Sequence, residues 1–202
     1  MSKNIALITG ASSGIGAVYA DRLARRGHDL ILVARDGGRM EAIARPLRAE
    51  TGRVVEVEAA DLTNRSDLAR IEDRLANDKA ITMLINNAGM SLNGGLLDNG
   101  PDVLLRLIAL NITAPTLLAS SAGKAFAARR AGAIVNISSV LALAPERFDG
   151  VYSGSKAFML NLTLSLATKL AEVGVRVQAV LPGATRTEIW ARSGKDIDAM
   201  PP

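Results

Sequence analysis

Short apolar runs rich in β-branched residues alternate with amphipathic segments along the whole chain, and this alternation constrains the fold more than any other feature. The expected strands cover residues 4–9, 29–34, 53–58, 81–86, 132–138 and 175–181. The expected helices, with apolar residues at three- and four-residue spacing, cover residues 15–26, 39–50, 65–77, 102–129 and 153–172. Such alternation forms right-handed crossover units. The sequence therefore predicts an α/β fold with a doubly wound parallel β-sheet and helices on both faces.

The composition narrows the possible chemistry. A chain of 202 residues that is 49% hydrophobic suits a single domain over residues 1–202. The sequence holds no cysteine and one histidine, His28, so we expect no disulfide, no metal site and no Ser-His-Asp hydrolase. A net charge of +4 on scattered arginines, with 3% aromatic residues, argues against nucleic acid but leaves an anionic small-molecule ligand plausible.

The sequence also suggests a compartment. The N-terminal run enters a glycine loop without the features of a signal peptide. The longest uncharged span, between Arg106 and Lys124, contains Asn111, Thr113 and Pro115, which favours a buried helix over a membrane span. We therefore expect a cytoplasmic protein without a membrane partner.

The first expected strand runs into TGASSGIG at residues 9–16, and a helix follows. In this context Gly10 allows a tight turn, Gly14 allows close approach to a pyrophosphate, and Gly16 allows helix and strand to pack closely. The helix N-terminus attracts anions. The loop could also be a structural turn, but a strand, glycine loop and helix in this order are typical of Rossmann-type dinucleotide-binding domains.

Six motifs then occur in one order: TGASSGIG, Asp61-Leu62, NNAG at 86–89, Asn111 in LIALNIT, NISS at 136–139, and Tyr152-x-x-x-Lys156 followed by LPGATRT at 181–187. In this set the chain resembles the short-chain dehydrogenase/reductase family over residues 4–190. Family members usually continue with a substrate lid, another helix and a seventh strand. We therefore expect that the C-terminal strand is missing and that the lid is truncated after about residue 188.

The resemblance implies roles in dinucleotide binding. The glycine loop would take the diphosphate, Asp61 and Leu62 would flank the adenine, and the NNAG motif would line the ribose. The residues implied in cofactor binding are Gly10, Ser12, Ser13, Gly14, Ile15, Gly16, Arg35, Asp61, Leu62, Asn87, Ala88, Gly89, Tyr152, Lys156, Pro182, Gly183, Thr185 and Thr187.

The end of the second expected strand indicates which dinucleotide is used. NAD-binding proteins usually place there an acid that binds the adenosine ribose, but this chain has Ala34. The next residue, Arg35, can bind a 2′-phosphate, and Ser12 or Ser13 could add a hydrogen bond. We therefore expect NADP(H) to be preferred, with NAD(H) possible. The alternative is that Arg35 is only a surface charge beside Asp36.

Tyr152 and Lys156 stand four positions apart and so share one helix face. A nearby ammonium favours the phenolate, so we expect Lys156 to lower the tyrosine pKa from about 10 toward neutrality. The resemblance assigns proton transfer to Tyr152, carbonyl binding to Ser139 and a water-mediated proton relay to Asn111. Ser138 is the neighbouring alternative to Ser139, and Asn111 could instead make only an interhelical hydrogen bond.

These observations predict an NADP(H)-dependent oxidoreductase that interconverts a carbonyl compound and an alcohol by hydride transfer. The catalytic set is Asn111, Ser139, Tyr152 and Lys156. The alternative is a dinucleotide-binding sensor or scaffold without turnover. The helices at 102–129 and 153–172 carry more apolar surface than one sheet face covers, so we expect a homodimer, or a tetramer for a longer form.

Overall fold

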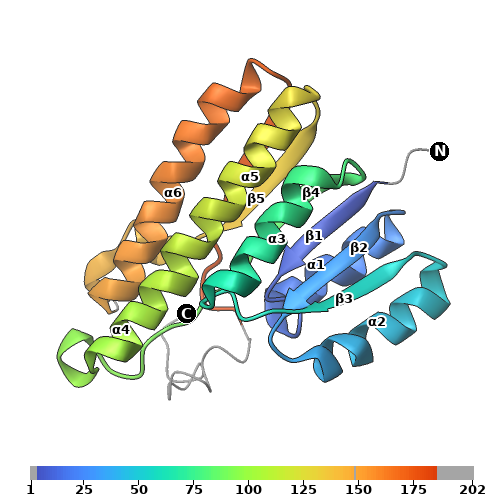
Figure 1. Ribbon diagram of the computed structural model, residues 1–202. Helices are drawn as coiled ribbons and strands as arrows, with labels where there is room; N and C mark the ends of the chain where they lie inside the picture. Colours follow the sequence, from blue (N-terminus) through green and yellow to red (C-terminus); the bar gives the residue numbers. More distant parts are fainter. Residues whose placement is uncertain (1–3, 148, 186–202) are drawn as a thin grey trace.

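The computed structural model describes residues 4–147 and 149–185, which form a central parallel sheet with helices on both faces (Figure 1). The strands are β1 (Ile5–Thr9), β2 (Asp29–Ala34), β3 (Val55–Ala59), β4 (Ile81–Asn86), β5 (Gly132–Ile137) and β6 (Val175–Val180). Their order across the sheet is β3-β2-β1-β4-β5-β6, and every neighbouring pair is parallel. The predicted doubly wound α/β fold is therefore confirmed.

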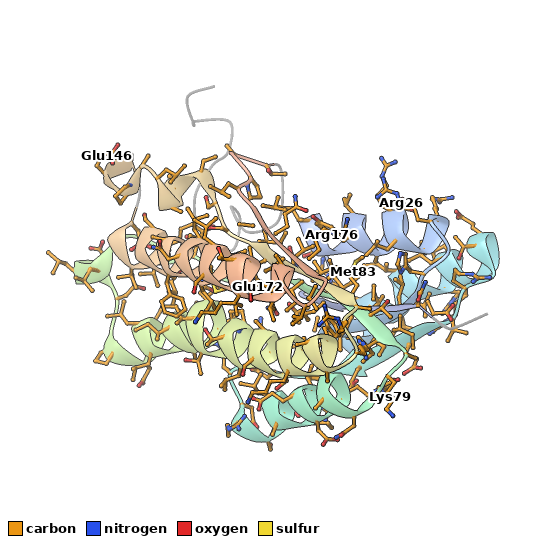
Figure 2. All side chains as sticks on the ribbon, turned by 90° about the horizontal axis from the view of Figure 1, so that it is seen from above. Arg26, Lys79, Met83, Glu146, Glu172 and Arg176 are labelled. Carbon is orange, nitrogen blue, oxygen red and sulfur yellow. The ribbon has the colours of Figure 1, made fainter. Side chains whose placement is uncertain are left out.

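The helices are α1 (Gly14–Arg25), α2 (Gly37–Thr51), α3 (Arg65–Asn77), α4 (Pro101–Ile108), α5 (Ala114–Ala128) and α6 (Gly150–Ala171). Figure 2 shows the sheet between two helical layers, with α1 and α2 on one side and α3, α5 and α6 on the other. Each layer buries its own apolar cluster, since Ala20, Leu23 and Met40 pack on one face of the sheet and Ile71, Leu118 and Phe126 pack on the other.

Several helix ends follow directly from the sequence. Asp36, Asn64 and Asp149 precede α2, α3 and α6, and each side chain accepts hydrogen bonds from backbone N–H groups of the first turn. After α2 the chain reverses at Gly52, which adopts a left-handed conformation with a φ of +66°. These caps fix where each helix begins relative to the strand before it.

The predicted helix at 102–129 differs in one respect. A π-helical turn at Ala109–Thr113 separates α4 from α5. Pro115 has no N–H group, so it cannot donate the usual helical hydrogen bond to the carbonyl of Asn111, four residues earlier. Widened turns of this kind occur often at functional sites, and this one contains the predicted catalytic residue Asn111.

The segment Pro101–Ala128 is long and apolar enough to cross a membrane by length and composition alone. Its apolar residues have another explanation in this fold. Leu107, Leu118, Ala122 and Phe126 are completely buried within the protein. These four side chains belong to the buried core, which takes up 33% of the apolar window.

Candidate active site

The predicted site residues lie at one edge of the sheet, where the carboxyl ends of the parallel strands meet. Each motif follows the strand before it: the glycine loop after β1, Arg35 after β2, Asp61 after β3, Asn87 after β4, Ser139 after β5 and Pro182 after β6. The strand order reverses between β1 and β4. In open α/β sheets, ligands bind beside such a reversal point.

Side chains from two distant segments join the glycine loop to the NNAG motif at this point. The amide nitrogen Nδ2 of Asn87 donates to the carbonyl oxygens of Thr9 at 2.9 Å and Gly10 at 3.2 Å. The Thr9 hydroxyl accepts from the backbone N–H groups of Asn87 at 2.9 Å and Ala88 at 3.0 Å. The loop after β1 is therefore held by β4 rather than only by its own turn.

Two glycines permit this close approach. A Cβ atom on Gly16 would lie 2.4 Å from the carbonyl oxygen of Gly10, and one on Gly10 would lie 2.8 Å from the Asn87 amide nitrogen. Gly14 has a φ of +56°, a conformation that favours glycine. The loop thus brings its backbone and the N-terminus of α1 to one open position. Ser13, the N-cap of α1, makes no side-chain capping bond, which leaves its hydroxyl available to a ligand.

The predicted adenine side contains an acid and two arginines. Asp61 accepts from Arg106 at 3.2 Å and from the backbone and hydroxyl of Thr63 at 3.0 and 2.7 Å. Partial burial raises the pKa of Asp61, but the bonds from Thr63 and the charges of Arg106 and Arg35 outweigh it and lower that pKa overall. Arg35 is exposed within electrostatic range of this carboxylate. The side chain of the predicted neighbour Leu62 is buried in the core, so only its backbone is open to an adenine.

Tyr152 lies in the first turn of α6 with its side chain largely buried. Its ring packs with Leu92 and Leu107, and partly buried Leu141 and Val151 contact the same cluster. Burial raises the pKa of the Tyr152 phenol, a hydrogen bond with the Ser139 side chain lowers it, and the charge of Asp149 raises it. The net pKa is above its ordinary value of 10.0. The structure thus joins the two hydroxyl groups that the sequence paired.

Lys156 lies one turn further along α6 and is buried. Its ammonium nitrogen Nζ donates to the carbonyl oxygen of Ile137 at 3.0 Å and lies 5.6 Å from the centre of the Tyr152 ring. Burial lowers the pKa of Lys156 to about 8. The expectation that Lys156 lowers the tyrosine pKa below 10 is therefore wrong for this structure. The physical reason is that burial disfavours both charged forms, the phenolate and the ammonium.

The two serines of the NISS motif make different contacts. Ser139 caps the short helix at Val140–Ala142 by accepting from the backbone N–H of Leu141 at 3.2 Å, and it reaches Tyr152. Ser138 instead donates to the carbonyl oxygen of Lys156 at 2.7 Å. The structure brings Ser139 rather than Ser138 to the tyrosine, and Ser138 anchors α6.

Asn111 lies in the π-helical turn and holds the segment after NNAG. Its Nδ2 donates to the Met90 carbonyl at 2.8 Å and to the Ser155 hydroxyl at 3.1 Å, and its Oδ1 accepts from the Met90 N–H at 2.9 Å. A Cβ on Gly89 would lie 3.4 Å from the Asn111 Oδ1 and 3.5 Å from the Lys156 Nζ. Gly89 therefore lies between the two predicted relay residues.

The segment after β6 completes this edge. The carbonyl of Pro182 accepts from the backbone N–H of Val140 at 3.1 Å, which joins it to the serine loop. The Thr185 hydroxyl donates to the Gly183 carbonyl at 3.1 Å. The predicted cofactor residue Thr187 and the expected lid lie outside the described residues.

The family model described as short chain dehydrogenase matches residues 4–198 of the chain. The chain belongs to this family. The match spans all six sequence motifs, and the observed sheet order carries them to one edge.

Relatives with known names agree with membership in the short-chain dehydrogenase family. The chain is 37% identical over 186 residues to human 17-beta-hydroxysteroid dehydrogenase type 3, covering 90% of this chain but only 59% of that protein. It is 34% identical to the cis-4-hydroxycyclohexanecarboxylate dehydrogenase of Sinomonas cyclohexanicum, covering 98% of this chain and 80% of that one.

Solved structures are more similar still. A short-chain dehydrogenase from Sphingobium yanoikuyae in complex with NADPH has a TM-score of 0.97 and 52% identity, covering 98% of this chain and 78% of that one. A bulky-bulky ketone specific alcohol dehydrogenase from Comamonas testosteroni has a TM-score of 0.90 and 50% identity, covering 92% and 74%.

Sequence reasoning missed three residues that build this short-chain dehydrogenase site. Thr9 stands inside the quoted glycine motif, yet its role in bonding the NNAG backbone depends on a contact across the sheet. Ser155 bridges Asn111 and the Tyr152 carbonyl, at 3.1 and 2.7 Å. Asp149 caps α6 three residues before Tyr152, and an acid just before an apolar helical run was a readable signal.

Proposed function

We propose that this short-chain dehydrogenase interconverts a ketone or aldehyde and the corresponding alcohol with NADP(H) as cofactor. One observation carries the proposal: the buried hydroxyl of Tyr152 is hydrogen-bonded to Ser139, one helical turn from the buried ammonium of Lys156. Two neutral hydroxyl groups that meet at the carboxyl edge of a parallel sheet can bind a carbonyl oxygen and give it a proton.

The residues present fit a dinucleotide. The glycine loop packs closely on itself and on the NNAG segment, since a Cβ atom on Gly10 would collide with Ala88 and one on Gly16 with the Gly10 carbonyl. Glycine loops between a strand and a helix bind the pyrophosphate of dinucleotides. The Ser13 hydroxyl and the N-terminus of α1 provide hydrogen-bond donors for phosphate oxygens. The exposed Arg35, with Ala34 in place of an acid, suits a 2′-phosphate. The NADPH and NADP complexes of similar proteins support the same choice.

The nicotinamide of the bound cofactor supplies the hydride in reduction and accepts it in oxidation. In the reductive direction Ser139 orients the carbonyl oxygen, and the protonated Tyr152 donates its proton to that oxygen. In the oxidative direction the Tyr152 phenolate removes the alcohol proton. The Lys156 ammonium lies beside Gly89 and Asn111. In this scheme it is the positively charged hydrogen-bond donor through which Tyr152 exchanges its proton.

Two apolar side chains beside Tyr152, Leu141 and Val151, are only partly buried. A carbonyl compound with apolar substituents would suit these neighbours. The relatives that act on steroids and bulky ketones, as their names state, have substrates of this kind.

A steady-state assay with a panel of ketones, aldehydes and secondary alcohols tests this proposal, with NADPH and NADH compared. Tyr152→Phe removes only the proton donor, so turnover should fall by at least about 100-fold while NADPH affinity stays within about twofold. Tyr19→Phe, on α1, is the matched control and should leave turnover unchanged. A wild-type chain that binds NADPH but turns over no compound in the panel would favour the sensor or scaffold alternative.

We also propose that the protein forms a homodimer through α4, α5 and α6. On the outer side of these helices Leu105, Ile108, Phe158 and Leu164 are exposed. Leu105 and Ile108 lie on α4, Phe158 and Leu164 lie on α6, and Figure 1 shows α5 and α6 side by side. A twofold axis at this face would pair the same residues of both chains and cover the apolar surface.

A further inference from the structure

Three polar side chains form a continuous chain of hydrogen bonds through the core, behind the proposed active site. We name Asn86 on β4, Asn136 on β5 and Thr163 on α6 the polar seam. Asn86 Nδ2 donates to Asn136 Oδ1 at 2.9 Å, and Asn136 Nδ2 donates to the Thr163 hydroxyl at 2.9 Å. Thr163 in turn donates to the Met159 carbonyl at 2.5 Å. The seam therefore connects two central strands to the helix that carries Tyr152 and Lys156.

Burying the three polar side chains of the seam costs free energy, so their presence in the core needs an explanation. Its three side chains are 4%, 0% and 1% exposed. A buried amide or hydroxyl is unfavourable unless it is hydrogen-bonded. Asn86 Oδ1 has no hydrogen-bond partner among the described residues, even though Asn86 Nδ2 has two acceptors, Asn136 Oδ1 and the Pro115 carbonyl at 3.2 Å. Apolar side chains would fill the same space without this cost.

The seam fixes the position and orientation of α6 on the sheet. Apolar contacts between a helix and a sheet tolerate small shifts, whereas hydrogen bonds fix both distance and angle. Each amide has only one orientation that fits, because a rotated Asn86 would point its oxygen at two acceptors. The seam thus specifies where α6 lies along β5.

The catalytic residues share the face of α6 that the seam holds. Thr163 lies seven residues, or about two turns, after Lys156, and Tyr152 lies one turn before it. Three consecutive residues of the β5 segment contact this face: Asn136 bonds Thr163, the Ile137 carbonyl accepts from Lys156 Nζ, and Ser138 bonds the Lys156 carbonyl. A shift of α6 along β5 would therefore break all three contacts together and separate Tyr152 from Ser139.

We propose that Asn136 and Thr163, anchored by Asn86, are positioning residues for the reaction proposed above. They fix the position of α6 along β5 and its rotation about its own axis, and so keep the Tyr152 hydroxyl against Ser139. Neither residue contacts the substrate in this scheme, and both act through Tyr152 and Lys156. The inference rests on the proposed function for its kinetic consequence only, since the seam itself is a feature of the fold.

Thr163→Val tests the seam with almost no change in shape, because it removes the hydroxyl that accepts from Asn136. We expect kcat to fall by about 10- to 100-fold, as for a displacement of roughly 1 Å at reacting groups, with the KM for NADPH within about twofold of wild type. Thr163→Ser keeps the hydroxyl and should restore kcat. Thr168→Val removes a similar bond, from Thr168 to the Leu164 carbonyl at 3.3 Å, on the exposed side of the same helix. This matched control should have wild-type kcat.

A second variant separates positioning from stability. Replacing both partners of a buried hydrogen bond with apolar side chains is often nearly neutral for stability. The triple variant Asn86→Leu, Asn136→Leu, Thr163→Val replaces every side chain of the seam, so it should regain thermal stability relative to Thr163→Val but remain slow. Recovery of kcat together with stability would show that the seam only stabilises the fold, and would overturn the proposal.

A readout without turnover keeps the seam testable if the proposed function fails. The chain has two tyrosines, so in a Tyr19→Phe background Tyr152 alone gives the ultraviolet titration of a phenol. The bond to Ser139 lowers the Tyr152 pKa, whereas burial and Asp149 raise it. Loss of the seam should weaken that bond and move the midpoint upward in Thr163→Val but not in Thr168→Val. An unchanged midpoint in Thr163→Val would refute the positioning role of the seam. A wild-type chain without turnover would refute only the proposed reaction.

Discussion

The ammonium nitrogen of Lys156 lies 3.0 Å from the carbonyl oxygen of Ile137, at the end of β5. This bond holds a buried cation in place at the cost of its hydration, which is why the pKa of Lys156 is lowered to about 8. Lys156 therefore destabilises the fold, yet it lies where a proton relay would need it. A residue of this kind indicates a position that serves catalysis rather than stability.

Replacement of this lysine should therefore stabilise the protein while it removes activity. Lys156→Met keeps the length of the side chain and removes the cost of burying a charge. We expect the free energy of unfolding at pH 7 to rise by about 1–2 kcal/mol, because the lost bond to Ile137 offsets part of the gain. Denaturant unfolding measures this change. Lys169→Met, an exposed position on the same helix, should change stability little, and a less stable Lys156→Met protein would contradict the argument.

The same lysine predicts how stability depends on pH. In the unfolded chain its pKa is about 10.4, and in the folded protein it is about 8. Between these values the unfolded chain binds a proton that the folded protein does not, so the contribution of Lys156 to stability increases as pH rises from about 8 to about 10. The difference between wild type and Lys156→Met should shrink over this range. A constant difference would show that Lys156 titrates normally.

The raised pKa of Tyr152 predicts different pH profiles for the two directions of reaction. At neutral pH the phenol is protonated, because burial raises its pKa above the ordinary value of 10.0. Reduction, which uses the phenol, should be nearly independent of pH between 6 and 8. Oxidation, which uses the phenolate, should accelerate by about tenfold per pH unit. The pH dependence of kcat/KM in each direction measures both, because it reports groups of the free enzyme. A reductive kcat/KM that falls steeply above pH 7 would indicate a phenol with a near-neutral pKa.

Arg35 should decide the choice between the two dinucleotides. Arg35→Ala removes a charge-assisted phosphate contact of about 1.5–3 kcal/mol, so NADPH affinity should fall by roughly 10- to 150-fold while NADH affinity changes little. Titration calorimetry gives both constants. Arg26 is the C-cap of α1, at the end away from the glycine loop, and Arg26→Ala is the control that should leave both affinities unchanged. An unchanged preference would make Arg35 a surface charge beside Asp36.

Light scattering should show a dimer at micromolar concentration. Leu164→Glu, on the exposed side of α6, places a charge in the proposed contact and should give monomers. Val54→Glu, exposed at the start of β3, is the matched control and should remain dimeric. A wild-type protein that is monomeric and fully active would contradict the proposed assembly.

The order of the elements was readable from the sequence, because hydrophobic periodicity is local. The predicted strand at 29–34 coincides with β2, and the predicted helix at 65–77 coincides with α3. The parallel sheet then brings the motifs to one edge, since each follows the carboxyl end of a strand. The division of the helix at 102–129 was missed, although Pro115 was visible, because a proline alone does not specify a π-helical turn.

The energetics of the site could not be read in the same way. The pairing of Tyr152 with Ser139 was predictable from the motif, but the pKa of each group depends on burial by side chains far away in sequence. Leu62 shows the same limit, because its place in the motif did not reveal that its side chain packs in the core. The polar seam joins residues 50 and 27 positions apart, and no local pattern reveals such bonds.

The bonds between Thr9 and the NNAG motif span 78 and 79 positions of the chain. A nascent or partly unfolded chain with β4 unpaired therefore contains the whole glycine sequence but lacks the shaped loop. Dinucleotide binding should for this reason be coupled to the docking of β4 onto β1. The bound ligand should then favour folding of the first half of the domain. Destabilising substitutions along β4, far from any phosphate, should accordingly be rescued by added cofactor, with a gain in stability that grows with the logarithm of the cofactor concentration.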